Sequence, residues 1–320
     1  MIKIIKFGGT IVNNQLYFSK VENIIGNELN NNNKLVIVVS AIGRDNDPYS
    51  TSKLTNLGPN LNEKEKAELL SYGERISSLV FLNALKEKKY NAGILMIDEI
   101  GINLEGNYLE GQLKSLDNKV LMEKLEIYDI LIVPGFIGLN NHRVGLLGLG
   151  GSDLTGIYLA KMLNIKEIYL YKDVDGVKSG DPKIIVDALT INKLSYDECL
   201  IFAKCGAKIV QNKAIEEAKK SNILINICAI MDLKVKTVIG NESSRLNFKG
   251  VMSKDDYIYL IFDNFEQYCK LICEILEKYN FNCLDIIKNP NYIGLKLEGG
   301  KRNFAMNILH HYFISKKIDL

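Results

Sequence analysis

A lysine and two glycines near the start of the chain are residue types suited to binding an anion. Lys6 ends a short apolar run and is followed by Phe7, Gly8 and Gly9. Glycine lets backbone N–H groups approach an anion without obstruction by a Cβ atom, and the lysine supplies a positive charge. The segment is not a Walker loop, because the chain contains no GxxxxGK(S/T) pattern. The alternative interpretation is an ordinary turn between a strand and a helix, with a surface lysine.

A second glycine-rich segment precedes a predicted helix. It contains Gly148, Gly150 and Gly151 and continues into Ser152 and Asp153 at the predicted helix start. The first N–H groups of a helix have no partner within the helix, and together with the helix dipole they favour an anion. The spacing does not fit the GxGxxG pattern of dinucleotide-binding proteins. The alternative is that the serine or the aspartate only caps the helix.

Two more segments place charged residues beside glycines. Lys172 and Asp173 follow a predicted strand, at the carboxyl end where open α/β sheets bind ligands, and the segment continues to Asp181 and Lys183. Lys208 lies near a predicted helix start, where a positive charge is unfavourable unless an anion is close. The alternatives are turn formation by Asp and Gly in the first case and an isolated, solvated lysine in the second.

The elements that must position these residues alternate between short apolar runs and longer helical patterns. Runs rich in Ile, Val and Leu predict buried strands at residues 2–7, 34–40, 94–97, 130–133, 166–171 and 225–230. Apolar residues at helical spacing predict helices at residues 17–30, 63–88, 113–127, 153–163, 195–204 and 207–221. Strands that alternate with helices indicate an α/β fold with a mostly parallel sheet covered on both faces.

The sequence changes in character after residue 240. Residues 241–245 form a polar connector. The smaller part that follows has predicted strands at residues 257–262, 283–288 and 292–297 and predicted helices at 265–279 and 302–313, and the tail at 317–320 is barely long enough for a fourth strand. Such a split βαβ order carries little functional information by itself. We therefore predict one domain over residues 1–240 and a small module over residues 250–320.

Composition narrows the class of protein. The net charge of +2 over 320 residues lacks the basic excess of a nucleic-acid-binding protein, and no apolar run approaches the length of a membrane span. The six cysteines form no CxxC pair, so we expect buried, reduced thiols, a cytoplasmic location and no metal site. None of the three histidines, His142, His310 and His311, has an obvious Ser, Cys or carboxylate partner, which disfavours a hydrolase triad.

Together these segments resemble the aspartokinase branch of the amino acid kinase family over roughly residues 1–240. Eight motifs occur in the order seen in that branch, which makes the resemblance specific for the family and less specific for the substrate. The motifs lie at residues 6–10, 38–41, 43–44 with 47–49, 71–74, 133–136, 150–153, 173–177 with 181–182, and 206–208. The remainder of the chain resembles a single, shortened ACT-type module.

The resemblance implies a three-layer αβα sandwich and a kinase reaction. In such kinases ATP donates its γ-phosphoryl group to the side-chain carboxylate of aspartate, in the first step of lysine, threonine and methionine biosynthesis, and Mg²⁺ is held mainly by the phosphates. The carboxylate is already ionised at neutral pH, so the reaction needs no general base. Catalysis then consists of positioning and charge neutralisation, with which the scarcity of histidine agrees.

Carried over residue by residue, the resemblance assigns roles to the motif residues. The implied catalytic residues are Lys6, Asp153 and Lys208, with Lys6 on the transferring phosphoryl oxygens and Asp153 orienting the cationic groups. The implied nucleotide contacts are Lys6, Phe7, Gly8, Gly9, Ser40, Ser152, Lys172, Asp173, Ser179, Asp181, Lys183 and Lys208. The implied contacts of the amino-acid substrate are Thr51, Glu74, Gly150 and Gly151, with Glu74 paired to the substrate's ammonium group.

Two departures from the family pattern leave alternatives open. The glycine loop of the family carries an arginine that clamps a carboxylate of the substrate, whereas this chain has Leu149, and Arg143 and Arg75 are the candidates to replace it. A kinase of the same family acting on another small amino acid or carboxylate is therefore one alternative. A non-catalytic nucleotide or amino-acid sensor is another. Aspartokinases typically carry a pair of ACT units, so we expect a homodimer, in which a second chain supplies the other unit.

Overall fold

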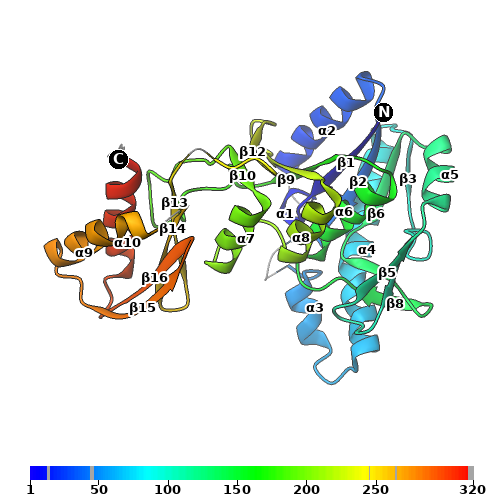
Figure 1. Cartoon of the computed structure of the whole chain (residues 1–320). Helices are drawn as coiled ribbons and strands as arrows, with labels where there is room; N and C mark the ends of the chain where they lie inside the picture. Colours follow the sequence, from blue (N-terminus) through cyan, green and yellow to red (C-terminus); the bar gives the residue numbers. More distant parts are fainter. Residues whose placement is uncertain (13–14, 44–46, 245, 264, 316–320) are drawn as a thin grey trace. The chain divides into compact units, whose positions relative to one another are not determined.

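The computed structural model describes residues 1–12, 15–43, 47–244, 246–263 and 265–315 (Figure 1). The chain forms two compact units, one made of Met1–Val174 and Lys213–Val235 and the other of Asp175–Asn212 and Lys236–Leu320. The segment Asp175–Asn212 thus joins the C-terminal part, while the domain limits at residues 240 and 250 stay a prediction from the sequence. Arg44 of the third motif and the predicted tail strand at residues 317–320 lie outside the described residues.

A parallel sheet runs through the first unit. The strands of this unit, in order across the sheet, are β11 (Leu224–Ala229), β9 (Glu167–Lys172), β1 (Ile2–Phe7), β2 (Lys34–Val39), β6 (Ile130–Pro134) and β3 (Ala92–Ile94). Each neighbouring pair is parallel, and Figure 1 shows β9, β1, β2, β6 and β3 side by side. The runs of Ile, Val and Leu that form the central strands are buried, as expected of a parallel sheet between helices. The predicted α/β fold is confirmed.

Helices cover both faces of this sheet. The described helices of the first unit are α1 (Gly9–Val12), α2 (Gln15–Asn30), α3 (Thr51–Leu57), α4 (Glu63–Glu87), α5 (Lys119–Ile127), α6 (Gly151–Met162) and α8 (Asn212–Ser221). Successive residues of a strand point to opposite faces of the sheet. Phe7 accordingly packs on Phe81 of α4, whereas Lys6 meets Asp153 of α6. The sheet is therefore the middle layer of a sandwich.

The helix predicted at residues 113–127 is wrong in its first part. Residues 112–116 form β5 (Gln112–Leu116), and α5 begins only at Lys119. The strand belongs to a small sheet with the order β5, β4 (Ile102–Glu105), β7 (Ile137–Asn140) and β8 (Arg143–Leu146). A short segment with few apolar residues fits the apolar periodicity of a helix and that of a strand equally well. Pairing with β4 therefore decides that residues 112–116 form a strand.

The helix predicted at residues 207–221 is also shorter than expected. The chain leaves α7 (Tyr196–Lys204) and enters α8 at Asn212. Gly206 has a φ of 114° in the turn between the two helices, a conformation that favours glycine and interrupts a helix. Lys208 therefore lies in this turn rather than at a helix start, and the dipole argument for an anion beside Lys208 does not hold.

The second unit contains an antiparallel sheet with the strand order β13 (Phe248–Lys254), β14 (Tyr257–Phe262), β16 (Tyr292–Leu297) and β15 (Cys283–Asn289). The three strands predicted here are confirmed, and β13 is an additional strand that the sequence prediction missed. The helical elements of this part are η1 (Phe265–Tyr268), α9 (Cys269–Lys278), α10 (Arg302–His310) and η2 (His311–Ser315). Residues of α9, α10 and the sheet share one apolar core. Another parallel pair joins β10 (Lys193–Ser195) to β12 (Val235–Gly240).

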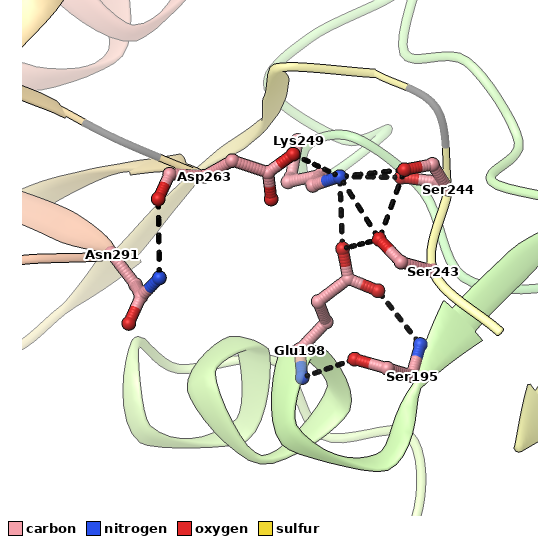
Figure 2. A network of polar contacts seen from close by, with 7 residues as sticks. All are labelled: Ser195, Glu198, Ser243, Ser244, Lys249, Asp263 and Asn291. Atoms are coloured by element: carbon pink, nitrogen blue, oxygen red, sulfur yellow. Dashed lines mark hydrogen bonds and ion pairs between the residues drawn. The ribbon is translucent and has the colours of Figure 1, made fainter. Parts of the chain in front are cut away.

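A buried lysine ties α7 to this sheet (Figure 2). The Lys249 side chain is 1% exposed, and its Nζ lies 2.8 Å from Glu198 Oε1 and 3.0 Å from Asp263 Oδ2. It also donates to the Ser244 carbonyl at 2.8 Å. Burial favours the neutral form of Glu198, but Lys249 and Ser243 outweigh it and lower the pKa of this carboxyl. A charged lysine is tolerated here because several oxygens replace its water.

The structure also tests two expectations from composition, that the cysteines are buried and reduced and that the chain has no membrane span. All six cysteines are free. Cys199, Cys205 and Cys228 are buried as expected, but Cys273 is exposed, so the expectation of burial is wrong for that residue. Among the described residues no helix combines the length and the apolar character needed to cross a bilayer.

Candidate active site

Three charged side chains meet where β1, β9 and the start of α6 come together. Lys6 Nζ lies 2.9 Å from Asp153 Oδ1, and Lys172 Nζ lies 3.4 Å from Asp153 Oδ2. Lys6 pairs in register with Leu170 of the adjacent parallel strand, so both lysines stand at the carboxyl-end edge of the sheet. Lys6 is only 8% exposed and Asp153 only 5%. The structure therefore places three of the predicted site residues in direct contact.

The two ammonium groups keep the Asp153 carboxyl ionised. Burial by itself would raise the pKa of this group, but Lys172 and Lys6 together outweigh burial, and the pKa lies below its ordinary value. Two positive charges and one negative charge leave the group with a net positive charge. Such a group at the ends of strands is suited to the oxygens of a phosphate, which accept strong hydrogen bonds from ammonium groups.

The glycines of the first motif differ in what requires them. A Cβ atom on Gly9 would lie 1.9 Å from the carbonyl oxygen of Ala41, so only glycine fits at this close approach of two backbone segments. A Cβ atom on Gly8 would meet nothing within 4 Å. Packing therefore does not require Gly8, whereas a ligand that approaches the backbone there would.

The second glycine segment forms the start of α6. Its N-cap residue, Gly150, has a φ of 80°, a left-handed conformation that glycine adopts without strain. Gly150 has no side chain to accept the first N–H groups of the helix. The Gly151 and Asp153 N–H groups donate to the Gly148 and Gly150 carbonyls, so the Ser152 N–H is a donor that the described residues leave for an anion. It lies next to Asp153 in the first turn of the same helix.

Two residues without a predicted role hold this glycine segment in place. The Phe136 N–H donates to Thr155 Oγ1 at 2.9 Å, and the Thr155 hydroxyl donates to the Gly151 carbonyl at 3.1 Å. Phe136 has a φ of 68°, which is rare for a large side chain. Phe136 belongs to the motif at residues 133–136, which is part of the family resemblance but assigned no role to this residue. Thr155 gave no sequence signal, because a threonine within a helix is an ordinary residue.

A cavity of about 190 Å³ opens beside the two glycine segments. Its lining brings together residues implied for the phosphates and residues implied for the amino-acid substrate. The lining residues with a predicted role are Gly9, Ser40, Thr51, Glu74, Gly150, Gly151 and Ser152. The others are Ala41, Gly43, Phe136 and Leu149. Residues from six separate stretches of sequence thus share one cavity.

Glu74 is the buried acid of this cavity. Its side chain is on α4, its Oε1 accepts the Ala41 N–H at 3.2 Å, and its Oε2 has no hydrogen-bond partner among the described residues. Burial raises the pKa of Glu74 to about 8, against the lowering effects of backbone N–H groups and of Lys6. A buried carboxyl with an unused oxygen is suited to receiving a cation, such as the ammonium group of an amino acid.

Other predicted contacts have surroundings that limit what they can do. The Phe7 side chain is fully buried between Phe81 and Tyr171, so only its backbone can reach a ligand. Asp173 Oδ2 accepts the Thr10 hydroxyl at 3.4 Å. Phe7 and Asp173 both belong to the first unit, and the exposed Asp173 directly follows β9.

The remaining predicted contacts, Ser179, Asp181, Lys183 and Lys208, belong to the second unit. Ser179 is 1% exposed, and its hydroxyl is bonded to His310 and to the Leu189 N–H. Asp181 Oδ1 accepts the Lys183 N–H at 2.9 Å, and both residues are exposed. The nucleotide role of this group stays a prediction from the resemblance.

The two arginines considered as substitutes for the missing clamp lie elsewhere. Arg75 and Arg143 line a different cavity, of about 610 Å³, which shares no lining residue with the cavity around Glu74. Arg75 Nη1 lies 3.1 Å from Glu68 Oε1, and its guanidinium lies over the Tyr72 ring. Neither of these two candidates therefore lines the cavity around Glu74. Leu149, at the position of the clamp, is 84% exposed.

Comparison with known proteins finds matches over most of the chain. The family model described as "Amino acid kinase family" matches residues 1–229. The chain is 31% identical to an aspartokinase of Bacillus sp. (strain MGA3), over 78% of this chain and 62% of that protein, and 31% identical to an aspartokinase of Geobacillus stearothermophilus, over 84% and 67%. The chain thus spans about three fifths to two thirds of the length of these curated relatives.

Solved structures show the same fold. The structure of E. coli aspartokinase III in complex with aspartate and ADP matches with a TM-score of 0.67 at 20% identity, over 94% of this chain and 79% of that one. The aspartate kinase of Clostridium acetobutylicum matches with a TM-score of 0.61 at 21% identity, over 99% and 83%. At these identities the likeness is one of fold.

Replacing Asp153 by asparagine tests the buried charge group. The variant leaves the buried Lys6 and the half-buried Lys172 without their counter-charge, so we expect a loss of about 3–5 kcal/mol of unfolding free energy at pH 7. A carboxyl with a depressed folded pKa stabilises above its unfolded pKa of about 4 and loses that contribution as the pH falls through the folded value. Urea unfolding at several pH values between 7 and 3 should therefore show that the difference in unfolding free energy between wild type and Asp153→Asn becomes smaller as the pH falls.

The matched control is Asp98→Asn, at an exposed aspartate of the same unit, which should change the unfolding free energy by less than about 0.5 kcal/mol. An Asp153→Asn protein as stable as the wild type at pH 7 would contradict the assigned charge group.

Proposed function

The chain belongs to the amino acid kinase family, and from that premise we propose that it transfers the γ-phosphoryl group of ATP to the side-chain carboxylate of L-aspartate, giving 4-phospho-L-aspartate. The proposal rests mainly on one observation. The group of buried Lys6, buried Asp153 and half-buried Lys172 has a net positive charge. Gly9, one of the glycines that follow Lys6, lines the cavity in which Glu74 keeps an unused carboxylate oxygen.

The phosphoryl side of the reaction needs charge neutralisation. An oxygen of the acceptor carboxylate forms a bond to the γ-phosphorus while the bond to the β-phosphate oxygen breaks, and ADP leaves with that electron pair. Lys6 and Lys172 neutralise the phosphoryl oxygens, Asp153 keeps both ammonium groups in place, and Gly8 lets its backbone approach. The attacking carboxylate is ionised at neutral pH, so no side chain has to remove a proton.

Mg²⁺ would be bound chiefly by the phosphates of the nucleotide. Among the described residues no group of three or more His, Cys, Asp and Glu side chains is placed to hold a metal ion. Phosphate oxygens, with few protein carboxylates, are the usual ligands of Mg²⁺ in such sites. When bound, the ion would supply positive charge that offsets the charge of the phosphates.

The acceptor side is built around Glu74. Its unused oxygen would pair with the ammonium group of the amino acid, and Thr51 and Ser40 add hydroxyl groups to the same cavity. Leu149, at the position where the family carries its arginine, is among the residues that line this cavity. This favours a second candidate, a kinase for a small acceptor with an ammonium group and only one carboxylate.

Three further expectations stay proposals. The antiparallel sheet of the second unit would be an ACT-like module, a homodimer would supply its partner unit, and the protein would be cytoplasmic. Whether the module binds an effector depends on that partner unit.

The direct test is ADP release that depends on both aspartate and Mg²⁺. Lys6→Met keeps the apolar stem and removes the ammonium group, so kcat should fall about 100-fold to 1,000-fold, as for the loss of a group that stabilises transition-state charge. The control is Lys3→Met, on the same strand, where Lys3 forms a partly exposed ion pair with Glu28 and lies over the Tyr169 ring. If wild type releases no ADP with aspartate or any small carboxylate, the proposed reaction is wrong and the sensor alternative remains.

Leu149→Arg tests the acceptor. A bidentate guanidinium–carboxylate bond is worth about 1.5–3 kcal/mol, so KM for aspartate should fall about tenfold to a hundredfold. Ile127→Arg adds the same charge at an exposed position of α5 and should leave that KM unchanged. An unchanged KM for aspartate in Leu149→Arg, together with faster turnover of an acceptor lacking the second carboxylate, would favour the second candidate.

The pH dependence of aspartate binding tests Glu74. Only the ionised carboxylate attracts an ammonium group, and its pKa of about 8 in the folded protein leaves it mostly protonated at pH 6. KM for aspartate should therefore fall by about tenfold per pH unit from pH 6 towards pH 8 and then level off. Glu74→Gln should raise KM and flatten this profile, while KM for ATP serves as the internal control. A flat profile for the wild type would exclude Glu74 as the ammonium partner.

A further inference from the structure

Ser77 of α4 bonds to a peptide group that Glu74 of the same helix also holds. The Ser77 hydroxyl donates to the Ser40 carbonyl at 2.7 Å, and Glu74 Oε1 accepts the Ala41 N–H at 3.2 Å. The Ser40 carbonyl and the Ala41 N–H belong to one planar trans peptide group, in which they point in opposite directions. Glu74 and Ser77 are three residues apart, so they lie on the same face of the helix. The two side chains therefore hold both polar groups of a single peptide.

The chain packs closely around this peptide. A Cβ atom on Gly73 of α4 would lie 3.0 Å from the Ala41 Cβ and 2.8 Å from the Tyr49 carbonyl oxygen. Glycine is unfavourable in the interior of a helix, so this close approach gives a physical reason for its presence there. The Ala41 carbonyl oxygen is also the atom that a Cβ atom on Gly9 would meet at 1.9 Å. Helix α4 and the glycine turn after β1 thus both pack against residue 41.

Two other serines of α4 make clear what is particular to Ser77. Ser71, Ser77 and Ser78 are all fully buried. The Ser71 hydroxyl donates to the Glu68 carbonyl at 2.7 Å, which is a bond within the helix. The Ser78 hydroxyl has no hydrogen-bond partner among the described residues. Of these three hydroxyls, that of Ser77 therefore connects the helix to Ser40, a residue that lines the cavity around Glu74.

The orientation of the peptide affects both oxygens of Glu74. The Ala41 N–H occupies Oε1, while Oε2 has no partner among the described residues. Burial raises the pKa of Glu74 to about 8, and the Ala41 N–H is the largest of the influences that oppose burial, ahead of the Glu74 N–H and Lys6. The charged side chain that acts on this pKa is thus Lys6 of β1, itself paired with Asp153 of α6. A change in the position of the Ala41 N–H would therefore change how readily Glu74 ionises.

We propose that Ser77 is a positioning residue for acceptor binding, whose hydroxyl holds the Ser40–Ala41 peptide so that its N–H stays on one oxygen of Glu74 and the other oxygen is left for the acceptor's ammonium group. Ser77 does not line the cavity and acts only through the peptide. Without the Ser77 hydroxyl, the Ser40 carbonyl loses this donor, and the peptide is held at one end only. The step to the acceptor rests on the proposed function, whereas the effect on Glu74 follows from the contacts of the ligand-free protein.

The first measurement uses the full chain without ligand. NMR titration of ¹³C-labelled glutamate carboxyl carbons gives the pKa values, and Glu74→Gln identifies the Glu74 signal. In Ser77→Ala the pKa of Glu74 should rise by about one pH unit, the equivalent of one hydrogen bond to the charged form. Ser77→Thr keeps a hydroxyl and should restore the wild-type pKa. Ser71→Ala and Ser78→Ala remove equally buried hydroxyls of the same helix and should leave the pKa of Glu74 unchanged.

Steady-state kinetics then follow the acceptor. A higher pKa leaves less of Glu74 ionised at neutral pH, so KM for aspartate in Ser77→Ala should rise about tenfold at pH 7 and approach the wild-type value above pH 9. KM for ATP and kcat should stay within about twofold. Ser78→Ala should keep the wild-type KM for aspartate at every pH. If Ser77→Ala does not fold, Ser77→Cys fills the same space with a weak donor and should shift the pKa of Glu74 and KM in the same direction.

The outcomes separate this role from the proposed function. A folded Ser77→Ala protein with the wild-type pKa of Glu74 would overturn the role of Ser77. Equal shifts in Ser71→Ala and Ser78→Ala would also overturn it, since they would report only the loss of a buried hydroxyl. A raised pKa of Glu74 with an unchanged KM for aspartate would overturn the step to the acceptor. Wild-type protein that turns over no small carboxylate would overturn the proposed function, while the NMR titration would still decide whether Ser77 acts on Glu74.

Discussion

The site depends on one buried carboxylate between two ammonium groups. The parallel sheet places Lys6 and Lys172 at the ends of adjacent strands, where two like charges in a poorly hydrated place repel strongly. Asp153 removes that repulsion and leaves one positive charge in excess. Because Asp153 lies in the first turn of α6, the same contact fixes the glycine segment before that helix. The cation pair and the Ser152 N–H are thus positioned together.

The alternation of β1 makes this arrangement sensitive to register. Phe7 packs with Phe81 under α4, while Lys6 points to α6 on the opposite face of the sheet. A shift of one residue in the pairing of β1 would place the lysine in the apolar core and the phenylalanine at the site. The apolar packing of Phe7 therefore holds Lys6 where it meets Asp153.

Much of this could be predicted from the sequence, because the main strands are continuous apolar runs and the ends of parallel strands share one edge. That reasoning reached Lys6, Asp153 and Lys172 from three distant segments. It failed where pairing decides the structure. Strands β5 and β13 have few apolar residues or a glycine within them, and only their neighbours in the sheets make them strands. The bond between His310 and Ser179 left no pattern in either segment, and neither did the partners of Lys249.

The two buried carboxyls of the site have opposite environments, which separates their roles. Asp153 has two ammonium partners, and its pKa is lowered, so its charge is already balanced in the protein without ligand. Glu74 has one backbone N–H on one oxygen and nothing on the other among the described residues, and its pKa is raised by burial. A carboxyl held in this way destabilises the folded protein, since ionising it without a partner is costly. A cation that enters the cavity relieves that cost. A ligand therefore has to supply the cationic partner of Glu74, whereas the fold already supplies the cationic partners of Asp153.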